Sequence, residues 1–328
     1  MTIYDVHCHV FNVNILKDMI HVPEHKKMEI ECTRTELHHW WKYLKELGEV
    51  FVDSEKANNE YLVDKLKEHF PKADVWATVP LMMDTSFLFA DALQAGQNIP
   101  DGEFDPGHLQ DQIDALQELS SSGNCYPFFA VDPRRTGVID EVLKGNYVTR
   151  KPGGFYGVKL YPRLGYHPMS GKLPQLYAYC AANNIPIMTH CSAGGFPTWS
   201  SPSDVYCDPE GFRPALVANP TLRIDFAHFG NQCPAWGNSI VDLMKTYPGV
   251  YSDLSCYTGA SDIEGFKTAF WNQDIVKART MYGSDYDIFY FTETGMDLDD
   301  YIQSFQNEFT VDELSNMMTT LPEKFLGI

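Results

Sequence analysis

Short runs of apolar and β-branched residues recur along the chain, and stretches with helical periodicity separate them. This alternation is typical of βα units that form a parallel sheet. Eight such runs predict eight strands, at residues 3–11, 74–83, 126–132, 157–161, 185–191, 222–229, 250–256 and 280–285. Eight parallel strands are the number that closes a TIM barrel. The pattern therefore predicts an α/β fold of the TIM (β/α)8 type.

The segments between the predicted strands carry apolar residues at helical spacing. Two examples are the sets Leu109, Ile113, Leu116, Leu119 and Leu173, Leu176, Tyr177, Cys180. Repeats at three and four residues place these side chains on one helix face, which can cover the outside of a barrel.

The first connection, at about residues 12–72, is unusually long for a barrel loop. It contains a periodic stretch with Leu37, Trp40, Trp41, Leu44 and Leu47. We expect a helical insertion after the first strand, and two interpretations stay open. It is either a lid over the active site or a helical pair that packs on the barrel rim.

Composition supports one barrel domain over residues 1–328. The chain has 44% hydrophobic residues, enough for a large core. The net charge of -19 would repel phosphate backbones, so nucleic acid is not an expected partner. A small-molecule substrate is expected, and a homo-oligomer stays open.

Several features favour a cytoplasmic protein. The eight cysteines show no framework spacing, which favours reduced thiols. Met1 leads directly into the first predicted strand, without the pattern of a secretion signal. No apolar run approaches the roughly 20 residues of a membrane helix, so we expect no membrane insertion.

Ionisable residues follow the apolar part of five predicted strands. His7 and His9 lie two apart on the first strand, where they share a face and could grip one ion. The fourth, fifth, sixth and eighth runs contribute Lys159, His190, His228 and Asp285. Burying such groups without partners costs several kcal/mol each, and a cation among imidazoles and a carboxylate offsets that cost. Their order predicts a metal site at the carboxyl ends of the strands.

The same residues carry a family resemblance. The chain resembles the amidohydrolase superfamily, and the wording of its motifs resembles the amidohydrolase-2 branch. The similar stretches are residues 5–9, GVKLYP at 157–162, MTHCS at 188–192, LRIDFAHFG at 222–230 and YGSDYD at 282–287. The ending LPEKFL at 321–326 only loosely matches the usual Asn-Pro-x-Arg-Phe-Leu, a departure that concerns packing more than chemistry.

The resemblance implies Zn²⁺, or another divalent transition metal in its place. With one ion, the arrangement this branch commonly uses, His7, His9, His190 and Asp285 would ligate or adjoin the metal. Asp285 would also shuttle a proton of the metal-activated water, and His228 would act beside it as acid or base.

A second arrangement of the superfamily uses two ions. Lys159 would then be carboxylated and bridge them, and His190 and His228 would hold the second ion. Lys159 could instead pair with Asp285 or anchor a substrate carboxylate. Its role at the catalytic site therefore stays open between these three possibilities. The GVKLYP motif resembles the branch in which one ion is usual, so the resemblance favours one ion.

Other residues near the predicted site have two interpretations. Arg163 could bind an anionic substrate group with its planar guanidinium, although a solvated loop charge is the favoured interpretation. Cys8 and Cys191 alternate to the opposite strand face and are interpreted as small core residues. Trp199, Tyr206 and Arg213 lie in the stretch after the fifth strand, where barrel loops build substrate pockets.

These observations predict a metal-dependent hydrolase that uses a metal-activated water on a C–N or C–O bond of an amide, cyclic amide, lactone or ester. The alternative enzyme is a non-oxidative decarboxylase of a small carboxylic acid on the same metal site. A barrel that binds metal or ligand without turnover is the alternative outside enzymes. The complete set of polar strand ends argues against it.

Overall fold

The structure is a computed structural model that describes residues 1–11, 54–88, 90–195, 202–231, 233–286 and 297–328. All eight predicted strands are present in it, each shorter than its sequence pattern indicated. They are β1 Thr2–Cys8, β2 Val75–Pro80, β3 Phe128–Ala130, β4 Gly157–Leu160, β5 Ile187–Thr189, β6 Ile224–Phe226, β7 Val250–Asp253 and β8 Thr280–Met281.

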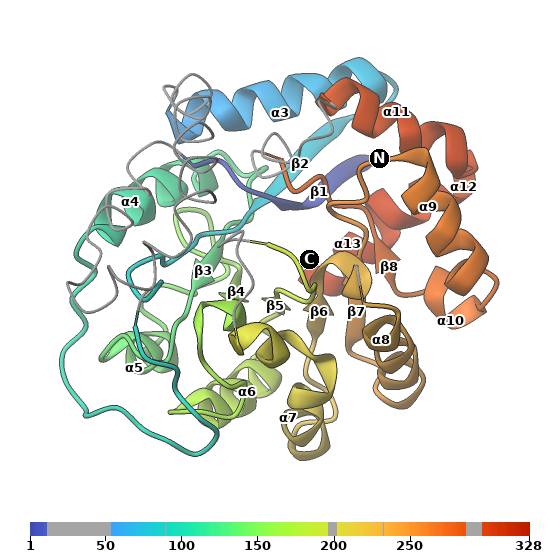
Figure 1. The fold of residues 1–328 in the computed structure, drawn as a ribbon. Helices are drawn as coiled ribbons and strands as arrows, with labels where there is room; N and C mark the ends of the chain where they lie inside the picture. The colour runs from blue at the N-terminus through green and yellow to red at the C-terminus, as the bar shows by residue number, and fades with distance from the viewer. Residues whose placement is uncertain (12–53, 89, 196–201, 232, 287–296) are drawn as a thin grey trace, which may run out of the picture.

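The strands lie side by side in chain order, and all pairs are parallel. Regular ladders form one sheet of β1 and β2 and another of β3 through β8. Further backbone contacts link the edges of the two sheets. Met82 N–H donates to the Phe128 carbonyl at 3.1 Å, and Val6 N–H donates to the Tyr282 carbonyl at 3.2 Å. The strands therefore form a ring, which the helices surround (Figure 1).

The inside of this ring is a hydrophobic cluster with contributions from every strand or the residue adjoining it. Its members include Tyr4, Ala77, Phe128, Tyr156, Met188, Ala227, Tyr251 and Met281. Inward-facing side chains stacked in layers are the packing of a TIM barrel interior. The predicted (β/α)8 architecture is thus confirmed.

A second, larger cluster packs between the strands and the helices around them. The helices are α3 Glu55–His69, α4 Leu109–Ser120, α5 Val138–Lys144, α6 Leu173–Ala182, α7 Arg213–Ala218, α8 Pro234–Thr246, α9 Ala260–Phe266, α10 Asp274–Lys277, α11 Leu298–Glu308, α12 Val311–Ser315 and α13 Leu321–Leu326. The two apolar sets predicted for helices are the buried faces of α4 and α6. None of the helices in the described ranges is long and apolar enough to cross a membrane.

Only the end of the predicted insertion is described. Helix α3 begins at the cap residue Ser54 and lies along the outside of β2. Asn58 donates to the Phe11 carbonyl at 2.7 Å, and Thr78 donates to Asn59 at 2.7 Å. This part of the insertion covers the barrel wall. The predicted periodic stretch around Trp40 lies outside the described residues. Both interpretations of the insertion, a lid or a helical pair on the rim, therefore stay predictions.

Helix α13 closes the amino-terminal end of the barrel. The Phe325 ring lies 6.1 Å from the ring of Phe128 and 5.5 Å from that of Tyr251, and its side chain is fully buried. Arg223 donates to the Lys324 carbonyl at 3.0 Å, and Arg150 donates to the Leu326 carbonyl. Cations at the carboxyl end of a helix satisfy its last carbonyls and its dipole. The departure in the LPEKFL ending therefore falls on packing, as expected.

We predict that Phe325→Ala lowers the free energy of unfolding by about 3–5 kcal/mol, the usual cost of emptying a buried aromatic site. Urea denaturation followed by circular dichroism measures this change. Val311→Ala is the matched control, because Val311 is 82% exposed and should change stability by less than about 0.5 kcal/mol. Equal stability of the two variants would show that α13 does not close the barrel.

Candidate metal centre

The polar residues predicted at the strand ends meet at the carboxyl end of the barrel. His7 lies in β1, Lys159 lies in β4, and His190 directly follows β5. His9, His228 and Asp285 lie one, two and four residues beyond β1, β6 and β8, respectively. All six side chains are buried.

Four non-glycine residues at this end have a left-handed backbone. They are His228 at φ 64°, Phe229 at φ 47°, Cys256 at φ 60° and Asp285 at φ 54°. This conformation is uncommon for residues with a side chain and is held by the surrounding structure. It interrupts the extended backbone after β6, β7 and β8, so these three strands end before the limits predicted for them.

The tautomer of His9 follows from its partner. His9 Nδ1 lies 3.0 Å from the Leu81 carbonyl oxygen, which can only accept, so Nδ1 carries the hydrogen. Burial lowers the pKa of His9 to about 4, and the ring is neutral at pH 7. Its Nε2 is therefore a lone pair, and it faces the Oδ1 atom of Asp285 at 3.2 Å.

His7 approaches the same carboxylate oxygen. Its Nδ1 lies 2.8 Å from Asp253 Oδ2, and its Nε2 lies 3.2 Å from Asp285 Oδ1. Burial opposes a charge on His7, but Asp253 and Asp285 outweigh it and raise its pKa. The site thus favours one positive charge between the ring and the two carboxylates.

These groups fit a divalent cation. One ligand atom each from His7, His228 and Asp285 lies within 4.8 Å of the others. His7 Nε2 and Asp285 Oδ1 are buried and make no hydrogen bond within the described residues. Imidazole nitrogen with carboxylate oxygen is a donor set that suits Zn²⁺ and neighbouring first-row ions. A cation would satisfy both atoms and supply the missing positive charge.

His190 is placed beside this group. Its Nε2 lies 2.8 Å from the Gly194 carbonyl, so Nε2 carries the hydrogen and Nδ1 is a lone pair. That Nδ1 lies 3.0 Å from His228 Nε2. Burial holds the pKa of His190 well below its ordinary value and lowers that of His228 to about 4. Both rings are neutral, the form in which imidazole binds a metal.

Lys159 has no hydrogen-bond partner for its Nζ atom among the described residues. The predicted pairing with Asp285 is therefore not formed. Burial lowers the pKa of Lys159 to about 8, although Asp285, Asp253 and Asp225 oppose this shift. A buried amine with a lowered pKa and no partner can be carboxylated or can bind a substrate anion.

Arg163 is not the solvated loop charge that the sequence favoured, because its side chain is buried. It lies in the 3-10 helix η3, Pro162–Leu164, and is 3% exposed. It donates to the Ala193 carbonyl at 3.1 Å and to the carboxylate of Asp204. It ties the loops after β4 and β5 together, and a role in binding substrate stays a prediction.

The other predicted pocket residues have partners of their own. Tyr206 donates to the side-chain oxygen of Gln94 at 2.8 Å. Arg213 makes two bonds to Glu210, at 2.6 and 2.8 Å. Trp199 lies outside the described residues. Cys8 and Cys191 are fully buried members of the outer core, as predicted.

Sequence reasoning missed Asp253, at the end of β7. It accepts hydrogen bonds from His7, from the His228 backbone at 3.1 Å and from the Ser255 backbone at 2.9 Å. Burial, and then the neighbouring charge of Asp253, hold the pKa of Asp225 well above its ordinary value. Asp253 ends an apolar run in the same way as Asp285, and that pattern is the signal that marks it in the sequence.

Cys256 was also missed. Its Sγ donates to Asp285 Oδ2 at 2.6 Å, so the second oxygen of that carboxylate is held while Oδ1 faces the histidines. No pattern in the sequence relates these two residues, which lie on different loops.

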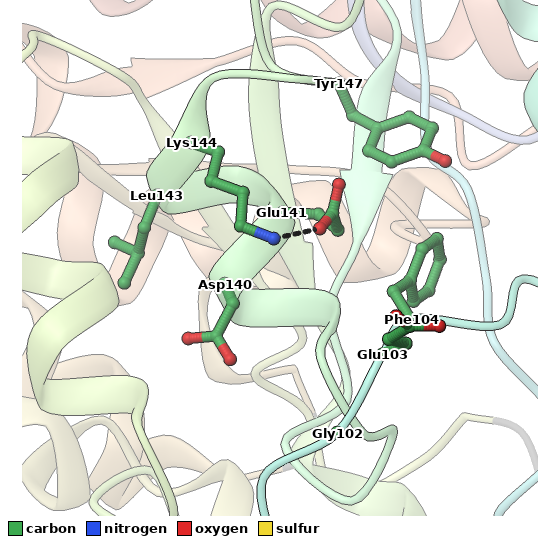
Figure 2. Close-up of a pocket in the computed structure, with 8 residues that line it drawn as sticks. All are labelled: Gly102, Glu103, Phe104, Asp140, Glu141, Leu143, Lys144 and Tyr147. Carbon is green, nitrogen blue, oxygen red and sulfur yellow. Dashed lines mark hydrogen bonds and ion pairs between the residues drawn. The ribbon is translucent and has the colours of Figure 1, made fainter.

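A separate cavity of about 620 Å³ lies on the outside of the barrel at α5 (Figure 2). It is lined by Gly102, Glu103, Phe104, Asp140, Glu141, Leu143, Lys144 and Tyr147. Three of its charged side chains are paired, since Lys144 contacts Glu141 at 2.6 Å and Asp140 contacts Lys172 at 2.8 Å. None of the strand-end residues lines this cavity, so it is not part of the candidate centre.

Solved structures with the same fold cover the whole chain. An uncharacterized TIM-barrel protein from Bordetella bronchiseptica is 16% identical, with a TM-score of 0.58, over 100% of this chain and 99% of its own. A probable 2-pyrone-4,6-dicarboxylic acid hydrolase from Acinetobacter baumannii, with citric acid bound, is 14% identical at a TM-score of 0.60 and covers 100% of both chains.

A 5-carboxyvanillate decarboxylase from Novosphingobium aromaticivorans is 11% identical, with a TM-score of 0.61, over 100% of this chain and 96% of its own. That structure is complexed with manganese and 4-hydroxy-3-methoxy-5-nitrobenzoic acid. At these identities the likeness supports the fold. No curated protein matches the sequence significantly.

The barrel and its buried histidine and carboxylate cluster define an enzyme of the amidohydrolase superfamily. More narrowly, residues 140–328 match the model of the amidohydrolase family Amidohydro_2, and the chain belongs to that family. The family is metal-dependent, in agreement with the fit of the site to a cation.

We predict that Gly283→Ala weakens cation binding. A Cβ atom at this position would lie 2.6 Å from the Cβ of His7, so the strand carrying His7 must shift. Zn²⁺ titration of chelator-treated protein measures the loss, which should be at least about tenfold if the ligand geometry moves. Gly265→Ala is the control, because a Cβ atom there would meet nothing within 4 Å and the affinity should be unchanged.

Proposed function

We propose that this protein is a metal-dependent hydrolase that acts on a C–N or C–O bond of a small molecule, such as an amide, a cyclic amide, a lactone or an ester. The observation that carries the proposal is the convergence of two histidine Nε2 atoms on one buried carboxylate oxygen, each at 3.2 Å. With both rings neutral, this arrangement would place lone pairs against a carboxylate, which is unfavourable unless a cation lies among them. The raised pKa of His7 is consistent with the same demand for a positive charge.

His7, His228 and Asp285 bring their ligand atoms together and would hold the ion. His9 faces the same Asp285 oxygen at 3.2 Å and would join them. A bound Zn²⁺ or similar ion supplies Lewis acidity and lowers the pKa of a coordinated water. Hydrolysis also requires a group that takes a proton and returns it to the leaving atom. Asp285 is suited to this role, because its Oδ1 faces the centre while Cys256 holds Oδ2.

The remaining residues would bind and orient the substrate. His228 is buried and neutral, so its ring can accept a proton beside the ion and return it to the substrate. Lys159 keeps its Nζ free of hydrogen-bond partners within the described part of the chain, which suits a substrate carboxylate. The enclosure of the site would exclude bulk water and strengthen both interactions.

Non-oxidative decarboxylation is the second candidate. One of the structures with this fold is a decarboxylase with bound manganese. The same lysine and histidines could orient a carboxylic acid, and a proton would then be delivered to carbon. The two reactions differ in whether an oxygen atom of water enters the product.

The first test is metal content. Protein purified without chelators should contain close to one equivalent of zinc or another first-row divalent ion, measured by inductively coupled plasma mass spectrometry. The histidine-rich donor set favours these ions over Mg²⁺ and Ca²⁺. Less than a tenth of an equivalent, with no uptake on reconstitution, would contradict a metal-dependent function.

The second test concerns Asp285. Asp285→Asn should lower kcat by about two to four orders of magnitude, because an amide cannot carry the proton. Asp299→Asn is the control: this surface carboxylate pairs with Lys65 on α3 and should leave kcat unchanged.

The reaction itself is identified with substrates in ¹⁸O-labelled water. Lactones, amides and aromatic acids should be screened for turnover, and the label should enter the product of a hydrolysis. Release of CO₂ without incorporation of label would favour the decarboxylase.

A further inference from the structure

We propose that Asp253 is a positioning residue that sets the ring tautomers of both His7 and His228, so that each ring presents an Nε2 lone pair to the cation. This inference rests on the metal-dependent function proposed above. It concerns a residue outside the predicted ligand set, at the end of β7.

The effect on His7 is direct. His7 Nδ1 lies 2.8 Å from Asp253 Oδ2, and both side chains are fully buried. An ionised carboxylate only accepts, so His7 Nδ1 must carry the hydrogen. In the neutral ring that binds a cation, the lone pair is then on Nε2, which is the atom 3.2 Å from Asp285 Oδ1.

The effect on His228 passes through Ser255. The Ser255 hydroxyl contacts Asp253 Oδ1 closely and lies 2.8 Å from His228 Nδ1. A hydroxyl has one hydrogen, and the carboxylate of Asp253 requires it as a donor. His228 Nδ1 must therefore donate to Ser255, and the lone pair of this ring is also on Nε2. This lone pair faces the Nδ1 lone pair of His190 at 3.0 Å, a contact between two acceptors that a cation would satisfy.

A second contact gives the same tautomer for His228. Its Nδ1 lies 3.3 Å from the Ser255 carbonyl oxygen, which cannot donate. Asp253 Oδ1 also accepts from the backbone N–H of His228 at 3.1 Å and of Ser255 at 2.9 Å. One carboxylate thus fixes the left-handed backbone at His228 as well as the ring orientation. Partners of this kind commonly orient metal-binding histidines, and their loss weakens metal binding.

The test uses Asp253→Asn, which preserves the size of the side chain and removes its charge. Chelator-treated protein is titrated with Zn²⁺ against a competing chromophoric chelator, and with Co²⁺ by its visible absorption. We expect about a 10–100-fold loss of affinity and an altered Co²⁺ spectrum. Nitrogen-15 NMR of the histidine rings should show a change in the tautomer of His7.

Asp132→Asn is the matched control. Asp132 is a buried carboxylate at the end of β3, and it pairs with Arg134 at 2.6 Å instead of with a histidine. This variant should lose stability while its Zn²⁺ affinity stays within about threefold of the wild type. Thermal unfolding of the metal-free proteins separates the two effects.

Ser255→Ala gives an independent test, and it carries the proposal if Asp253→Asn does not fold. It removes the hydroxyl relay to His228 but leaves the bond to His7. The His228 Nδ1 then keeps only the backbone carbonyl of residue 255, so this ring should exchange between tautomers while His7 is unchanged, with a loss of affinity of less than about tenfold. Wild-type affinity and tautomers in these variants would overturn the proposed role of Asp253 but not the metal-dependent function. A wild-type protein that binds neither ion would overturn the metal-dependent function as well.

Discussion

The arrangement of this molecule depends on an electrostatic requirement at the carboxyl end of the barrel. The Nε2 atoms of His7 and His9 face one oxygen of Asp285. On the far side of the two rings, the Nδ1 hydrogens are donated to Asp253 and to the Leu81 carbonyl. In a region of low dielectric such a meeting of acceptors is costly. A positive charge removes the cost, and it turns a destabilising cluster into a specific cation site.

The barrel tolerates this cluster because it keeps the polar groups at one end. The interior below them is apolar from strand to strand, and α13 seals the opposite end with Phe325. Parallel strands bring their carboxyl ends to the same rim, so residues far apart in the chain, such as His7 and Asp285, become neighbours. The left-handed residues after β6, β7 and β8 then direct their side chains into the centre rather than along the strands.

Hydrophobic periodicity was sufficient to predict the eight strands and the α4 and α6 faces, because burial on a barrel repeats with each βα unit. The strand ends were predicted too long, since the turn at residues such as Cys256 depends on contacts with Asp285 that lie in another loop. The burial of Arg163 could not be foreseen for a similar reason: its partner Asp204 is 41 residues away. Asp253 was missed although its position resembles that of Asp285, because it lies outside the motif stretches and acts through a histidine.

The closure of the barrel by α13 has a consequence for the order of folding. Phe128 and Tyr251 need Phe325 to complete their packing, although β3 is nearly two hundred residues earlier in the chain. During synthesis, the interior layer at the amino-terminal end stays incomplete until residues 321–326 have left the ribosome. Contacts of such long sequence separation form late, and the apolar ends of the strands remain open to other chains in the meantime. A chaperone that shields this end would act after all eight strands have been synthesised rather than on the first strands alone.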